Sequence, residues 1–168
     1  MERSPEKALL VAGFIYTENE IYRRAKELLS NDWGEMTEES AAIPFEFTDY
    51  YRTEMGEGLL RRFAVFSTSF RAHRLKNAKK TAMQVEESLS SGGRRRINID
   101  PGYLTADKLV LATHKQYPFS VAITEGISAV LELLYYTGSY QPLHWTYPDY
   151  RQMVEFFNGL RLRFFPRK

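Results

Sequence analysis

The sequence predicts an α+β fold: a mostly antiparallel sheet with helices, in which a ferredoxin-like βαββαβ core precedes a β-meander and a C-terminal helix. Three observations lead to this prediction. Strand and helix patterns alternate in the first part of the chain, and short strands joined by turn residues follow. Apolar residues at helical spacing then predict a helix at the C-terminus. Because no long linker divides the 168 residues, we expect one domain over residues 1–168.

The composition excludes several classes of site and partner. The chain has no Cys, so it can form neither a disulfide nor a thiolate nucleophile nor a Cys-ligated zinc site. Its formal net charge of +2 argues against nucleic acid as a partner. No apolar run approaches the roughly 20 residues that span a bilayer, and the N-terminus lacks a cleavage site, so we expect no membrane partner and a cytoplasmic location.

The first two elements have clear patterns. Residues 7–16 are apolar on both alternating faces, which predicts a strand buried on both sides in the middle of a sheet. Thr17 and Glu20 have the spacing of a capping box and predict the start of a helix. Gly34 is expected to end that helix, whose buried stripe would consist of Ile21, Ala25, Leu28 and Leu29.

The next segment alternates less regularly. Residues 41–49 predict a half-exposed strand and residues 50–58 a loop. Residues 59–70 predict another strand, and residues 72–89 a helix. Basic residues crowd the first half of this helix, either as a solvated face or as an anion site near its N-terminus.

Residues 94–100 predict a strand with one highly polar face. Its period of two places Arg95, Ile97 and Ile99 on one side and the polar residues on the other, namely Arg94, Arg96, Asn98 and Asp100. This polar face either is exposed to solvent or lines a cleft that receives a phosphate or carboxylate. Asp100 to Tyr103, with the sequence DPGY, predicts a turn after the strand.

The remaining elements complete the predicted fold. Residues 105–115 form either a short helix capped by Thr105 or another buried strand. Glu125 and Gly126 predict a hairpin, and residues 137–139 a turn into a third strand. The last helix is expected to begin at Pro148.

Carboxylates cluster in the predicted loop. Asp49, Glu54 and Glu57 lie within nine residues and could hold a hard cation such as Mg²⁺, or could be ordinary surface acids. The three His show no zinc-binding spacing, so we predict no metal site. Neither a G-x-S-x-G nucleophile elbow nor a P-loop is present, and the sequence identifies no cofactor.

Three stretches resemble one known family. Residues 44–59 (PFEFTDYYRTEMGEGL), 94–115 (RRRINIDPGYLTADKLVLATHK) and 142–151 (PLHWTYPDYR) together resemble the prokaryotic family called domain of unknown function 4416. The resemblance covers nearly the whole chain but implies no activity. It draws attention to polar residues that match the motifs, among them Asp49, Glu54, Asn98, Asp100, Tyr103, Lys108, Lys115, Trp145, Asp149 and Arg151.

We therefore predict a polar cleft that binds a small anionic ligand, such as a phosphorylated metabolite, and that acts on it if the protein is an enzyme. Arg94, Arg96 and Lys108 would neutralise the ligand, and Tyr103 and Trp145 would stack on it. The predicted catalytic residues are Asp49, Glu54, Asp100 and Lys108, and the predicted ligand-binding residues are Arg94, Arg96, Asn98, Tyr103, Lys115, Trp145, Asp149 and Arg151. The alternative is a non-catalytic interaction or structural module that forms a homodimer.

Overall fold

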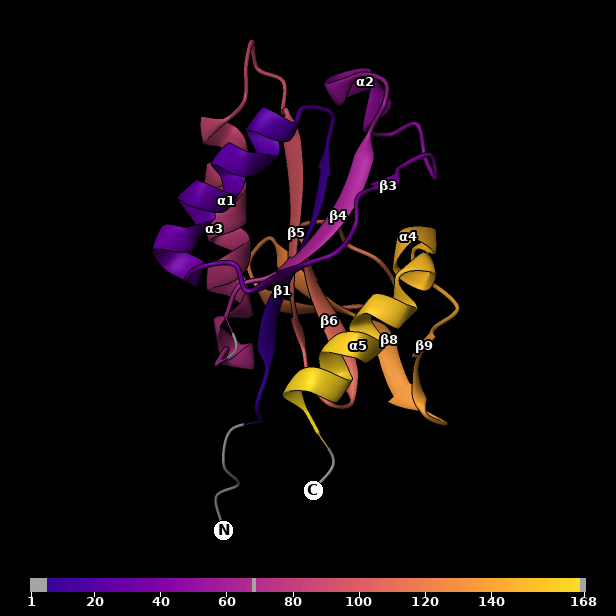
Figure 1. Cartoon of the computed structure of the whole chain (residues 1–168). Helices are drawn as coiled ribbons and strands as arrows, with labels where there is room; N and C mark the ends of the chain where they lie inside the picture. Colours follow the sequence, from indigo (N-terminus) through magenta and orange to yellow (C-terminus); the bar gives the residue numbers. More distant parts are fainter. Residues whose placement is uncertain (1–5, 68, 167–168) are drawn as a thin grey trace.

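The computed structural model describes residues 6–67 and 69–166 and shows an α+β fold with a mostly antiparallel, nine-stranded open sheet (Figure 1). The strand order is β2-β4-β1-β5-β6-β8-β7, with β3 on β4 and β9 on β8. The strands are β1 Leu9–Tyr16, β2 Glu38–Glu39, β3 Ile43–Pro44, β4 Leu60–Val65, β5 Ile97–Leu104, β6 Lys108–Thr113, β7 Ser120–Thr124, β8 Ile127–Tyr136 and β9 Ser139–Pro142.

The described residues form five α-helices and one short 3₁₀ helix. These are α1 Asn19–Trp33, α2 Arg52–Met55, η1 Ala72–Arg74, α3 Leu75–Ser88, α4 Pro148–Gln152 and α5 Val154–Phe164. The α+β class with a mostly antiparallel sheet is thus confirmed. The ferredoxin-like arrangement stays a prediction, because the nine strands form a sheet larger than that core.

Strand β1 lies inside the sheet and is buried along its whole length, as the sequence predicts. Its alternate side chains enter two separate cores, Leu10 and Phe14 on one face and Leu9 and Val11 on the other. Helices α1 and α3 lie side by side on the first face, and α5 crosses the second (Figure 1). Burial on both faces explains why the strand carries no polar positions.

Helix α1 forms where expected, but its start differs from the prediction. It begins at Asn19, after Glu18, and no side chain caps its first turn, so the expected capping box of Thr17 and Glu20 is wrong. Glu20 instead pairs with Arg23, one turn along the helix. Gly34, with φ of +81°, ends the helix as predicted.

The segment between α1 and β4 is less regular than predicted. Only residues 43–44 of the expected strand at 41–49 pair with β4, and a separate two-residue strand precedes them. The expected loop at 50–58 contains the helical turn α2. Phe45 is nevertheless buried, and it packs with Ile15 and Leu59. Apolar contacts, and not the pairing of a regular strand, therefore fix the position of this segment.

The largest correction concerns Asp100, Pro101, Gly102 and Tyr103, which continue β5 and do not form a turn. Strand β5 pairs with β1 through all four residues. A Cβ atom on Gly102 would lie 2.5 Å from the carbonyl oxygen of Val110. Glycine is therefore needed here for the close approach of β6 and not for a positive φ.

The C-terminal half consists of antiparallel strands joined by turns, but its order differs from a simple meander, because β6 pairs with β8, which lies between β6 and β7. Residues 108–113 form strand β6, so the strand alternative is correct for this segment and the helix alternative is wrong. Gly126, with φ of +73°, lies in the β7–β8 turn, and Thr137 and Gly138 form the β8–β9 turn. Helix α4 begins at Pro148 as predicted, and Met153 separates it from α5.

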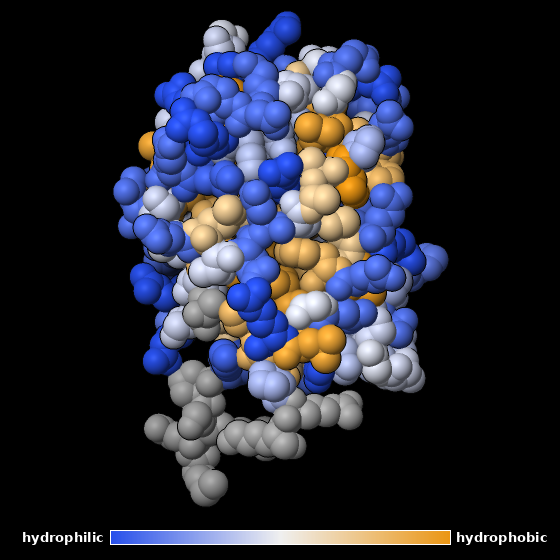
Figure 2. All heavy atoms as spheres, viewed as in Figure 1, coloured by the Kyte–Doolittle hydropathy of each residue, from blue (hydrophilic) through white to orange (hydrophobic). Residues whose placement is uncertain are grey.

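The surface is mostly hydrophilic in the view of Figure 2, with hydrophobic residues gathered over the middle of the molecule. Among the described residues, no helix is long and apolar enough to cross a membrane.

Candidate functional site

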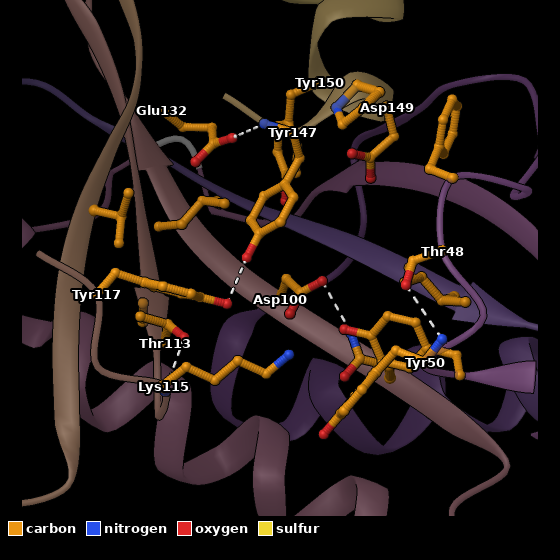
Figure 3. A pocket seen from close by; sticks show the side chains of 18 of the residues that line it. Thr48, Tyr50, Asp100, Thr113, Lys115, Tyr117, Glu132, Tyr147, Asp149 and Tyr150 are labelled. Atoms are coloured by element: carbon orange, nitrogen blue, oxygen red, sulfur yellow. Dashed lines mark hydrogen bonds between the residues drawn. The ribbon is translucent and has the colours of Figure 1, made fainter. Parts of the chain in front are cut away.

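A cavity of about 380 Å³ lies on the face of the sheet that carries α4 (Figure 3). Its wall contains residues from strands β1, β5, β6 and β8, from helix α3 and from the start of α4. Two connecting segments, residues 45–51 and residues 114–119, complete it. These parts are far apart in the chain, and sheet pairing and helix packing bring them together.

Beside the cavity lies the buried guanidinium of Arg61 on β4, whose side chain is 2% exposed. Its Nη1 atom donates to Asp100 Oδ2 over 2.9 Å, and its Nη2 atom donates to the Tyr150 hydroxyl over 3.0 Å. Its Nε atom lies 2.8 Å from Asp149 Oδ2 as an ion pair without hydrogen-bond alignment. Arg61 therefore joins β5 to α4 through two carboxylates.

Burial and the charge of Arg61 act in opposite directions on the pKa of each of these acids. Burial opposes ionisation of Asp100, but the positive charges of Arg61 and Lys79, together with the hydrogen bonds from Arg61 and Asn98, outweigh it and lower the pKa of that carboxyl. For Asp149, burial is the larger effect and raises the pKa. The pKa values of the two acids are therefore shifted in opposite directions, as is common for acid and base groups of functional sites.

Glu132 on β8 is a third acid of the cavity wall, and it is 1% exposed. Its Oε1 atom accepts a hydrogen bond of 2.8 Å from the backbone N–H of Tyr147. No cation pairs with it among the described residues, and burial raises its pKa to about 8. At neutral pH Glu132 therefore carries a proton.

Basic side chains lie on another part of the wall. Lys79 on α3 is 2% exposed and donates to the carbonyl oxygen of Ile99 over 3.4 Å. Lys115 lies 4.0 Å from the centre of the Tyr50 ring, as a cation–π contact at the cavity. Burial, together with Lys79 and Lys115, lowers the pKa of His114, so this residue is neutral at pH 7. The cavity wall thus carries both acidic and basic side chains, and Lys79 is close enough to Asp100 to lower the pKa of that acid.

Aromatic rings complete the wall. The hydroxyl groups of Tyr117 and Tyr147 are 2.7 Å apart and join the segment after β6 to the start of α4 (Figure 3). Tyr117 stacks on Phe119, with ring centres 5.0 Å apart. Such rings offer flat apolar surfaces on which a planar ligand can stack.

Four of the residues predicted from sequence line this cavity: Asn98, Asp100, Lys115 and Asp149. Asn98 donates to Asp100 Oδ2 over 2.9 Å, so it orients the same oxygen that Arg61 contacts. Figure 3 shows Asp100, Lys115 and Asp149 around one space. The structure thus brings together part of two predicted motifs.

Four other predicted residues lie outside the cavity wall, namely Asp49, Glu54, Arg94 and Arg96. Asp49 is exposed and pairs with Arg52. Glu54 accepts hydrogen bonds from the side chain and the backbone N–H of Arg95. Arg96 pairs with Glu18, and Arg94 lies in a turn where its backbone pairs with Ser91.

The remaining predicted residues also lie outside the wall. Lys108, at the start of β6, pairs with Glu6, and Tyr103 packs near that end of the sheet. Trp145 stacks on Phe119 with ring centres 5.2 Å apart, behind the cavity wall. Arg151 donates to the carbonyl oxygens of Leu143 and Thr146 and so holds the loop before α4.

Sequence reasoning missed three charged groups of the site, Arg61, Lys79 and Glu132. A usable signal existed for Glu132, because it is the one charged residue of an otherwise apolar strand, SAVLELLYY. Lys79 occupies a position that continues the apolar stripe of α3. Arg61 had no comparable signal, because it is followed by Arg62, which pairs with Glu39 on the outside of the sheet.

Among the described residues, no group of three or more His, Asp or Glu side chains is arranged to hold a metal ion. Asp49, Glu54 and Glu57, considered above for Mg²⁺, bind arginines instead.

Comparison with known proteins identifies the family. Residues 6–164 match the family model described as Domain of unknown function (DUF4416). The chain belongs to this family. Searches of the curated proteins and of the solved structures return no match. Membership in DUF4416 confirms the resemblance carried by the three sequence motifs, and it brings no activity with it.

Proposed function

We propose that this DUF4416 protein binds a small anionic ligand with a planar ring in the cavity between β5, β6, β8 and α4. The observation that carries the proposal is the presence of buried ionisable side chains around one aromatic-walled space. A buried charge costs folding free energy unless it is paired, so groups of this kind are typical of binding sites.

Lys115 supports the anionic character of the ligand. Its Nζ atom contacts the rings of Tyr50 and Tyr51, and it forms no ion pair with a described carboxylate. Of the three cations predicted from sequence to neutralise the ligand, Arg96 and Lys108 are paired with Glu18 and Glu6, and Arg94 lies outside the cavity wall. Lys115 is therefore the cation better placed to receive a phosphate or carboxylate.

The aromatic wall supports a planar ligand. Tyr50, Tyr117 and Tyr147 come from three different segments and line the same space (Figure 3). A volume of about 380 Å³ falls in the range of small-molecule sites. Rings on several sides would exclude water and strengthen the attraction between Lys115 and an anion.

The proposal can be tested by isothermal titration calorimetry against aromatic carboxylates and nucleoside monophosphates. We expect wild-type protein to bind at least one of these probes, and Lys115→Gln to weaken that binding by about tenfold, the value of one charge-assisted contact. Lys80→Gln is the matched control, because Lys80 is an exposed lysine of α3 outside the cavity. Equal loss in both variants, or no binding of any probe, would contradict the proposal.

A second candidate function is self-association. Strand β7 ends the sheet, and it exposes Val121 (68%) and Ile123 (39%) without a charged residue between Ser120 and Thr124. Such an edge can pair with a second copy of itself. Sedimentation equilibrium would show a dimer that Val121→Lys dissociates, whereas a wild-type monomer would exclude this candidate.

A further inference from the structure

Glu132 has a position in the cavity that the binding of an anion does not explain. Its side chain is 1% exposed, and only Oε1 accepts a hydrogen bond from the protein, from the Tyr147 N–H. Its other oxygen makes no hydrogen bond with a described residue, although Glu132 lines the cavity. A buried polar group without a partner is costly unless a ligand or water completes it.

The geometry points to Glu132 as a side chain that donates a hydrogen bond to an acceptor atom of the ligand, at the end opposite the anionic group. This inference rests on the proposed function and deepens it by naming the class of ligand. That class is a planar ring with an anion at one end and an uncharged acceptor, such as a ring nitrogen or a carbonyl oxygen, at the other. In the view of Figure 3, Glu132 lies above and Lys115 lies below the hydrogen-bonded hydroxyls of Tyr117 and Tyr147, so the two side chains reach different parts of the cavity.

Glu132 can donate because it holds its proton at neutral pH. Burial raises its pKa to about 8, and the Tyr147 N–H offsets this only in part. The charged groups that face it are Arg61 from β4, Asp100 from β5 and Asp149 from α4. The guanidinium of Arg61 is already shared by these two aspartates, so it does not form an ion pair with Glu132.

The backbone fixes the direction of this donor. The Thr146 hydroxyl donates to the backbone oxygen of Glu132, and the Tyr147 N–H binds its side chain. The start of α4 therefore holds both ends of the residue. A held carboxylic acid loses little conformational entropy when a ligand binds, which favours selection between ligands that differ in one acceptor atom.

Two probes of nearly equal size test the inference. Isonicotinate and benzoate carry the same carboxylate on a flat ring, but only isonicotinate has a ring nitrogen at the opposite end. At about pH 7 we expect isonicotinate to bind about tenfold more tightly to the wild-type protein, the value of one hydrogen bond. At about pH 9, where Glu132 is ionised and has lost its donor, we expect this preference to disappear.

Glu132→Gln provides the matched variant. A glutamine still accepts from the Tyr147 N–H and can donate an N–H to the ring nitrogen, but it does not titrate. We expect it to keep the preference for isonicotinate at both pH values. Circular dichroism of each protein at each pH checks that the fold is intact.

The outcomes separate this inference from the proposed function. If both probes bind equally at about pH 7 and Lys115→Gln weakens both, the proposed function stands and the role of Glu132 is wrong. A preference that survives at about pH 9 in the wild-type protein would also overturn it, because an ionised Glu132 cannot donate. If neither probe binds, the inference is overturned, whereas the proposed function is overturned only if the nucleoside monophosphates also fail to bind.

Discussion

Arg61 and Asp149 form an ion pair of 2.8 Å in which the two side chains are only 2% and 4% exposed. The pair joins β4 near one edge of the sheet to the first turn of α4, near the C-terminus of the chain. Buried ion pairs add little net stability, because desolvation offsets their attraction. Their loss is nevertheless costly when one charge is left alone, and this asymmetry makes the pair testable.

Arg61→Met should destabilise the protein by about 3 to 5 kcal/mol, because Asp149 and Asp100 would keep their burial without a cation. Arg62→Met is the matched control, since Arg62 is the next residue and its longer 3.4 Å contact with Glu39 is more exposed. We expect that variant to lose about 1 kcal/mol or less. Urea unfolding measures both values, and equal losses would contradict a special role for Arg61.

Gly13→Ala should displace the guanidinium of Arg61. An added Cβ would lie 2.9 Å from Arg61 Cζ and 3.0 Å from Phe63 Cε1. We expect a loss of about 1 to 3 kcal/mol, as for other overpacked cores. Gly159→Ala in α5 meets no atom within 4 Å, so it should instead stabilise the protein by up to about 1 kcal/mol. Thermal unfolding of both variants compares the opposite signs directly.

Glu132→Gln should change how stability depends on pH. The folded-state pKa of Glu132, about 8, lies above the ordinary value of 4.5, so its contribution is fully present below about pH 4.5 and is lost as pH rises to about 8. Relative to the wild type, the variant should gain a few kcal/mol between about pH 5 and pH 8, because it does not ionise. Urea unfolding across this range gives the difference, and a constant difference would disprove burial of a neutral Glu132.

Thr137→Asn should stabilise the β8–β9 turn. Thr137 has φ of +51°, a left-handed conformation that β-branched residues rarely adopt and that Asn tolerates. We expect a gain of about 0.5 to 1 kcal/mol in the free energy of unfolding. Gly138→Ala, at φ of +87°, should have the opposite effect. A loss of stability in Thr137→Asn would show that the bond from Gln141 to the Thr137 hydroxyl outweighs the strain.

Local sequence patterns correctly predicted the elements whose burial or turn geometry depends on a few neighbouring residues. Strand β1 is apolar throughout because both faces of the sheet are covered there, and α1 stops at a glycine whose positive φ suits a helix end. The β7–β8 hairpin likewise follows from a glycine at its turn. In these cases the local chemistry of a few residues and the final structure agree.

The same local rules failed where a partner strand decided the outcome. The DPGY sequence from Asp100 to Tyr103 has strong turn propensity, yet β1 pairs with all four residues, β6 also pairs with Gly102 and Tyr103, and the segment stays extended. Residues 105–115 left two alternatives open, and pairing with β5 and β8 selected the strand. The conformational preference of a short segment does not depend on which strand will lie beside it, so it could not predict these outcomes.

The sequence by itself determined the α+β class, the family and four of the residues that line the cavity, because composition, periodicity and motifs are local properties of the chain. Only the tertiary structure decided that Arg61 joins Asp100 to Asp149. It also decided that Lys108 pairs with Glu6 and lies outside the cavity wall. Charge interactions depend on the distance between side chains and on their burial, and both arise when β4, β5 and α4 pack together.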